Sequence, residues 1–327
     1  MKQALRLLGV AVAIAAGIYF LRHAARAFDD VLATDLSVAR MLAAAAAMLP
    51  AYLVAVPLGA VMWRRLLGAM GVPLAAGWAY AIVAFTQFAK YLPGNVAHHV
   101  GRVVVARPLG GNLARLSLSV VYENLLTALA AAHLTAVLLV MHPVPALEPY
   151  LPTPWRPWLL LAATAGAGLG FLLLRFMVLE VQRMRGTPVE AANHVVTPGP
   201  SALFTCYCLA LASFLVAGLG FTTMAPIIAP GSGFPYPALC GAFAAAWVIG
   251  LLVPGAPAGL GIREGVLLVL VGETMSTSDA VVMIAILRVV TTLGDLIHFI
   301  AGGAMLRRLR ARSAAGTSVP ANGGHLR

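Results

Sequence analysis

Long apolar runs constrain this chain more than any other feature of its sequence. They occupy residues 5–21, 40–63, 113–140, 157–178, 202–228 and 280–306. Each has about the length that a helix needs to cross a bilayer core, roughly 20 residues. Only 10% of the 327 residues are charged and 61% are hydrophobic, which a soluble domain could not bury. The sequence therefore predicts an all-α polytopic membrane protein with about six full spans.

Two further apolar regions, residues 74–106 and 238–271, are each interrupted near the middle by a Pro-Gly pair. The breaks are Pro93-Gly94, followed by Asn95, and Pro254-Gly255, with Gly259 and Gly261 behind it. Proline and glycine end helices and permit tight turns. As a helix, the arm 78–91 would extend about 21 Å, short of a hydrocarbon core of about 30 Å. Each region is predicted to form a re-entrant helical hairpin whose tip lies within protein or a wet cavity.

Basic residues between the apolar runs predict the orientation of the chain. Arg64 and Arg65 precede the first hairpin, which places its entrance on the cytoplasmic side. Segments 229–237 and 272–279 contain no Lys or Arg, so the second hairpin enters from outside. Both termini are then cytoplasmic. A cleaved signal peptide over residues 5–21 is the alternative at the N-terminus, and a retained first helix is favoured because many spans follow.

A shift of 161 residues carries the first hairpin region onto the second. It places Pro93-Gly94 on Pro254-Gly255 and Arg102 on Arg263. It also carries residues 40–63 onto 201–224 and 113–140 onto 274–301. Because the topology inverts, the sequence predicts an inverted repeat, about 40–140 and 201–304, an architecture typical of secondary transporters. We expect one transmembrane domain, residues 1–306, followed by a polar, disordered cytoplasmic tail, 307–327.

Two arginines are the leading candidates for binding an anion. Arg102 and Arg263 each lie nine residues past a Pro-Gly break, and a guanidinium offers planar donors that suit phosphate. For Arg102 the alternative is a charge at the membrane boundary. Lys90 precedes the first break, and its alternative is an extension to the cytoplasmic interface. The predicted binding residues are Lys90, Pro93, Gly94, Asn95, Arg102, Pro254, Gly255, Gly259, Gly261 and Arg263.

Four further ionisable residues lie inside apolar segments, where an isolated charge is expensive. Glu123, Glu264, Arg288 and Asp295 are predicted to act in proton coupling or in buried ion pairs. The repeat places the helices of Glu123 and Arg288 in equivalent positions and predicts a pair between them, with a transport role or a packing role. His298, three residues after Asp295, is placed to bond it, either as a proton relay or, as we favour, as a structural histidine.

Sequence motifs for catalysis are absent. The chain has no Gly-x-Ser-x-Gly, Walker loop or His-Glu-x-x-His motif. No enzyme activity, cofactor or metal site is therefore predicted. The net charge of +11 lies between apolar runs and in the C-terminal tail, where it sets topology and does not indicate a nucleic-acid partner. The expected partners are the lipid bilayer and a membrane lipid.

Two motifs resemble those of a known family. They are Lys90-Tyr91-Leu92-Pro93-Gly94 with Gly101-Arg102, and Pro254-Gly255-Ala256-Pro257-Ala258-Gly259-Leu260-Gly261-Ile262-Arg263-Glu264. The chain resembles the transmembrane region of lysylphosphatidylglycerol synthase and its stand-alone flippase-like relatives, from about residue 5 to residue 306. Full-length synthases add a soluble aminoacyl-transfer domain, and this chain stops at Arg327, so aminoacylation is not expected.

The resemblance implies a prokaryotic cytoplasmic-membrane protein that moves a lipid between leaflets, passively or coupled to an ion. An anionic phospholipid, an aminoacyl-lipid or a polyprenyl-phosphate-linked lipid are the expected cargo classes. The alternative is a non-transporting subunit or scaffold for an enzyme that makes cell-envelope lipid or glycan. A membrane-embedded transferase acting on polyprenyl lipids is a third hypothesis, and it lacks the carboxylate cluster or metal site that it would need.

Overall fold

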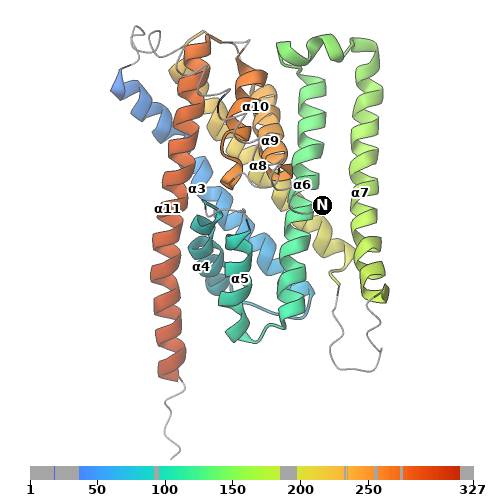
Figure 1. The fold of residues 1–327 in the computed structure, drawn as a ribbon, viewed down its shortest axis with the longest axis vertical. Coiled ribbons are helices and arrows are strands. Elements are labelled where there is room, and N and C mark those ends of the chain that lie inside the picture. The colour runs from blue at the N-terminus through green and yellow to red at the C-terminus, as the bar shows by residue number, and fades with distance from the viewer. Residues whose placement is uncertain are drawn as a thin grey trace, which may run out of the picture.

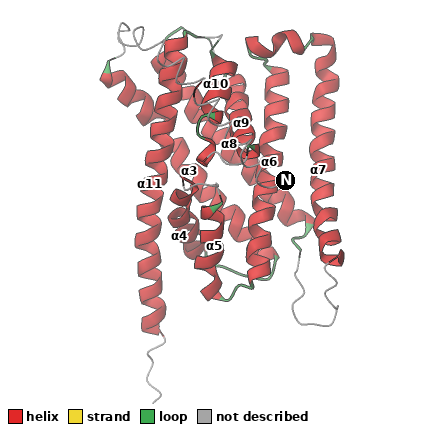
Figure 2. Cartoon of the chain, in the orientation of Figure 1, coloured by secondary structure: helices red, strands yellow, loops and turns green. Residues whose placement is uncertain are grey.

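The chain is an all-α, multi-pass membrane protein. The computed structural model describes residue 18 and residues 37–91, 96–184, 197–231, 233, 235–253, 257–272 and 275–316. Within these ranges all regular structure is helical (Figure 2). Five helices are long and apolar enough to cross a membrane: α3 (Val38–Ala69), α6 (Leu113–Met141), α7 (Arg156–Met184), α8 (Pro200–Ile228) and α11 (Thr277–Gly316). They coincide with five predicted spans. The predicted span 5–21 lies outside the described residues except for Ile18.

Helix starts and close helix contacts follow from local sequence. The side chains of Ser37 and Asn112 accept a backbone N–H in the first turns of α3 and α6, which satisfies donors that a helix leaves unpaired. The α3 and α8 helices then pack along each other. A Cβ atom at Gly220 would lie 2.7 Å from the Cβ of Ala51, so glycine allows these two helices to approach.

Two pairs of short helices occupy the space between the long ones. The first pair is α4 (Ala76–Gln87), which continues into η1 (Phe88–Tyr91), and α5 (Ala97–Ala106). The second is α9 (Tyr236–Leu252), the short turn η5 (Pro257–Gly259) and α10 (Ile262–Val271). In Figure 1 the first pair lies in the lower half of the molecule and the second in the upper half. The two pairs meet where η1 contacts η5.

The chain reversals within these pairs were predicted at the Pro-Gly breaks. Pro93, Gly94, Asn95, Pro254 and Gly255 all lie outside the described residues. Shortly after the second break, the backbone of residues 258–261 forms a left-handed hook. Ala258, Gly259 and Gly261 have φ values of 51°, 69° and 81°. Glycine adopts this region without the Cβ clash that other residues meet, so the two glycines permit the hook.

Helix α11 runs the full height of the molecule beside both short-helix pairs (Figure 1). It packs against α4 and α3. The helix extends to Gly316, so the expectation of a disordered tail from residue 307 is wrong for residues 307–316. Arginine, leucine and alanine dominate this stretch and favour the helix once it has begun. Residues 317–327 lie outside the described part of the chain.

Candidate functional site

A cavity of about 240 Å³ lies between the two short-helix pairs. Its lining residues come from α3, α4, η1, α5, α6, α8, α9, η5, α10 and α11. Its charged and polar lining includes Lys90, His98, His99, Arg102, Glu123, Asn124, Arg263, Glu264 and Arg288. Its aromatic lining is Tyr52, Tyr91, Phe214, Phe243 and Trp247. The fold thus gathers at one place most of the ionisable residues that the sequence singled out.

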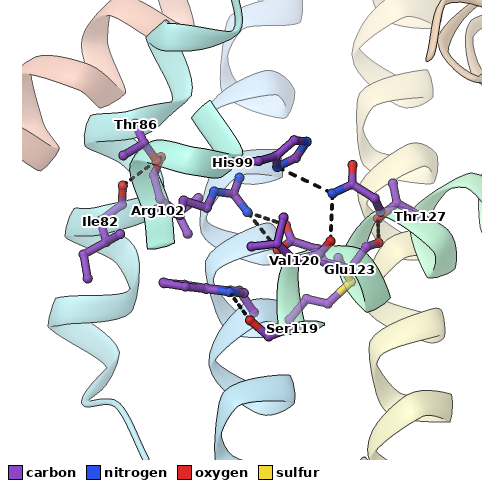
Figure 3. Close-up of polar contacts among 12 residues, drawn as sticks. Ile82, Thr86, His99, Arg102, Ser119, Val120, Glu123 and Thr127 are labelled. Atoms are coloured by element: carbon purple, nitrogen blue, oxygen red, sulfur yellow. Dashed lines mark hydrogen bonds and ion pairs between the residues drawn. The ribbon is translucent and has the colours of Figure 1, made fainter. Parts of the chain in front are cut away.

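Arg102 on α5 is bound to Glu123 on α6 (Figure 3). One nitrogen, Nη1, donates to both carboxylate oxygens at 2.6 and 2.8 Å. Both residues are buried, at 4% and 7% exposure, so Arg102 lies inside the protein and its charge is neutralised there. Beside the pair, His99 contacts the side-chain amide of Asn124 at 3.5 Å. The alternative of a boundary charge does not describe this environment.

A second ion pair joins α11 to α10. Arg288 Nε donates to Glu264 Oε1, and Arg288 Nη2 donates to the carbonyl of Gly259 at 3.3 Å. The other carboxylate oxygen, Glu264 Oε2, is buried and has no hydrogen-bond partner among the described residues. The predicted pair between Glu123 and Arg288 is therefore wrong. Each residue bonds a partner on the short-helix pair that packs beside its own helix.

Asp295 on α11 is fully buried and holds the end of the first short helix. It accepts hydrogen bonds from Tyr52 at 2.8 Å and Tyr91 at 2.6 Å, and pairs with Lys90 Nζ at 2.7 Å. Lys90 is thus directed inward, which contradicts an extension to the cytoplasmic interface. The expected bond between Asp295 and His298 is also wrong. His298 Nδ1 bonds the hydroxyl of Tyr80 at 3.0 Å, and its Nε2 has no partner in the described chain.

Residues on one face of helix α11 therefore bond to both short-helix pairs. Arg288 and Asp295 are seven residues apart, two helical turns, so they project in similar directions. Arg288 holds the second pair and Asp295 holds the first. Because buried ion pairs of this kind are expensive to break, the two contacts fix the cavity walls relative to α11.

Arg263 differs from the other three cations at the cavity. Its Nε is buried without a hydrogen-bond partner, and no carboxylate of the described residues pairs with it. Its guanidinium lies over Trp247, with Cζ 5.6 Å from the ring centre. Four basic side chains, Lys90, Arg102, Arg263 and Arg288, thus face three acidic ones, Glu123, Glu264 and Asp295. The described site carries one excess positive charge, and it resides on Arg263.

Several residues of the site were not anticipated from sequence. Trp247, Tyr52 and Gly250 lie in uniformly apolar stretches, where no local pattern distinguishes a cavity residue from a lipid-facing one. Gly259 and Gly261, which were anticipated, form the hook beside Arg263. Neither a protein-family model nor a curated protein matches this chain. The fold and the site define a multi-pass α-helical membrane protein with a charged internal cavity.

Proposed function

We propose that the protein is a flippase-like membrane lipid transporter whose cavity receives an anionic lipid headgroup at Arg263. The observation that carries the proposal is the excess charge on this arginine. A cation without a counter-ion inside a membrane protein is expensive and typically marks a functional site. A guanidinium with free donors binds phosphate or carboxylate strongly because the hydrogen bonds are charge-assisted. The missing counter-ion is then supplied by the ligand.

The architecture that we propose is a pair of oppositely oriented re-entrant hairpins within an inverted repeat. The helix bounds support it: α8 begins 162 residues after α3 (38 to 200), α9 begins 160 after α4 (76 to 236), and α11 begins 164 after α6 (113 to 277). The contact between η1 and η5 supports hairpin tips that meet at mid-membrane. We further propose that residues 5–21 form a sixth span and that both termini are cytoplasmic, as the apolar run and the distribution of arginine indicate. Transporters place their sites at such a meeting point.

The net charge of the site limits which lipid headgroups we expect it to bind. One excess positive charge matches a headgroup with a net charge of −1, as in phosphatidylglycerol. The cavity of about 240 Å³ is small for a lipid and suits a headgroup, so the hydrocarbon tails remain in the bilayer. Glu264 Oε2, which has no partner among the described residues, is the carboxylate oxygen most available for a proton if transport is ion-coupled. The resemblance to the flippase-like family of the prokaryotic cytoplasmic membrane supports the same interpretation.

Transport is testable in liposomes that contain the full-length chain. The assay follows the movement of fluorescent phosphatidylglycerol between leaflets with a membrane-impermeant quencher. We expect Arg263→Gln to slow transport by about tenfold or more, because a hydrogen bond to a charged group contributes about 1.5–3 kcal/mol. Arg307→Gln, at an exposed position of α11, is the matched control. Equal rates for folded wild type and Arg263→Gln would overturn the proposed role of Arg263. Rates no higher than those of protein-free liposomes would favour the non-transporting subunit.

A further inference from the structure

The side chain of Arg263 passes between two glycines. A Cβ atom at Gly250 would lie 2.7 Å from Arg263 Cγ and 2.9 Å from Nε, and one at Gly259 would lie 2.7 Å from Nε. Real Cβ atoms do not approach so closely, so only glycine leaves room at both positions. Gly250 belongs to α9, Gly259 to η5 and Arg263 to α10. The arginine is therefore threaded between the first arm and the turn of the second short-helix pair.

The Arg263 side chain occupies the space that a Cβ atom would need at both glycines. At Gly250 and at Gly259 the three nearest atoms to an added Cβ all belong to Arg263. A glycine that serves helix packing is different: an added Cβ at Gly302 would meet the backbone of the neighbouring helix at Phe85 and Ala81. Gly250 and Gly259 thus shape a channel for Arg263 and do not serve to bring two helices together.

Trp247 completes the channel on the side of the guanidinium. It lies three residues before Gly250 on α9, and its ring packs edge-on against Phe214 with centroids 5.1 Å apart. The guanidinium of Arg263 lies over this ring. Such a contact stabilises the cation without using its N–H groups as hydrogen-bond donors to another residue.

We propose that Gly250, Gly259 and Trp247 are positioning residues that hold Arg263 extended in the cavity with its donors free for an anionic headgroup. Arginine has many rotamers, and fixing it before the ligand arrives removes an ordering cost from binding. Arg288 contributes indirectly, since its bond to the Gly259 carbonyl anchors the channel wall to α11. This inference rests on the proposed function and adds the residues that give Arg263 its geometry.

The test compares the binding of phosphatidylglycerol and of phosphatidylcholine to the purified full-length chain in detergent, by native mass spectrometry. We expect Gly250→Ala and Trp247→Leu each to weaken phosphatidylglycerol binding by about tenfold and to leave phosphatidylcholine binding unchanged. Trp247→Phe keeps a ring under the guanidinium and is expected to retain binding. Gly168→Ala on α7 is the matched control, because Gly168 is not part of the cavity lining and an added Cβ there meets nothing within 4 Å.

A double-mutant cycle separates positioning from general structure. If Gly250 and Trp247 act through Arg263, neither substitution weakens phosphatidylglycerol binding further in an Arg263→Gln background. Additive losses of phosphatidylglycerol binding would overturn the inference. It would also be overturned if Arg263→Gln weakened binding while Gly250→Ala and Trp247→Leu did not. Both results leave the proposed function intact. Unchanged binding in Arg263→Gln would overturn both. If Gly250→Ala fails to fold, Trp247→Leu decides, because it removes atoms and adds no clash.

Discussion

Arg102 and Arg263 lie 161 residues apart, and of these two arginines only Arg102 has a carboxylate partner among the described residues. In the first half, the short helix supplies the arginine and the long helix α6 supplies Glu123. In the second half the roles are exchanged, since the short helix supplies Glu264 and the long helix α11 supplies Arg288. Among the described residues this arrangement leaves Arg263 without a carboxylate partner. The two arginines therefore have different electrostatic environments, which predicts different responses to substitution.

Removal of Arg102 is expected to destabilise the protein. Arg102→Ala leaves Glu123 buried without its counter-ion, a loss of about 3–5 kcal/mol for pairs of this kind. The double variant Arg102→Met/Glu123→Leu removes both charges and is expected to recover most of that loss. The measurement is the free energy of unfolding in a lipid environment. Wild-type stability in Arg102→Ala would contradict the role of the pair.

Removal of Arg263, unlike removal of Arg102, is not expected to lower the free energy of unfolding. Arg263→Met breaks no ion pair of the described chain and removes a cation whose Nε is buried without a hydrogen-bond partner, so we expect stability to stay unchanged or to rise by about 1 kcal/mol. The same variant is expected to lose transport of phosphatidylglycerol. The check is to measure unfolding and transport on one preparation. A loss of stability as large as that of Arg102→Ala would show that Arg263 has a structural partner.

The contacts of Asp295 predict the reactivity of Lys90. Asp295→Asn removes the counter-ion of the partly buried Lys90, so η1 opens more often and Lys90 reacts faster with an amine-specific reagent. We expect a rise on the order of tenfold, equivalent to about 1.4 kcal/mol of easier opening. Lys2 is the other lysine in the sequence, and peptide mass spectrometry distinguishes the two sites.

The control for this prediction is Tyr80→Phe. It removes the hydroxyl that bonds His298 and leaves every contact of Asp295 in place. We expect its Lys90 labelling rate to match the wild type. Equal rates in Asp295→Asn and in the wild type would mean that Asp295 does not control access to Lys90.

The helical framework was predictable because bilayer thickness imposes it. A run such as 113–140 is long and apolar enough to have one stable form in lipid, and α6 occupies Leu113–Met141. The end of α11 was not predictable in this way. Beyond the apolar run, the length of the helix depends on the helix propensity of each residue and on the turns already formed before it. Neither of these defines where α11 ends near Gly316.

The sequence did not predict which charged residues pair with each other in the cavity. The sequence singled out Arg102, Glu123, Glu264 and Arg288 as ionisable residues within apolar segments, and the structure places all four at the cavity. Which carboxylate meets which arginine depends on the rotation and crossing of α5, α6, α10 and α11, and a shift of one turn changes the partner. The threading of Arg263 between two glycines depends on the hook at η5, which sequence spacing does not define.

Close packing of α11 against α4 gives a final prediction, at Gly302. A Cβ at this position would lie 2.5 Å from the backbone nitrogen of Phe85 and 2.9 Å from the carbonyl of Ala81, and backbone atoms cannot yield as a side chain can. Gly302→Ala is therefore expected to lower the free energy of unfolding by about 1–3 kcal/mol. Gly168→Ala on α7 is the control, since its Cβ meets nothing within 4 Å.

The same variant tests whether helix packing and the charged cavity are connected. Helix α4 continues directly into η1, which carries Lys90, so a displaced α4 also moves Lys90 from Asp295. We expect Gly302→Ala to raise Lys90 labelling, and Gly168→Ala to leave it unchanged. If Gly302→Ala lowers stability without altering labelling, the contact of α4 with α11 and the ion pair of Lys90 with Asp295 are independent. A rise in both would show that helix packing holds the lysine in place.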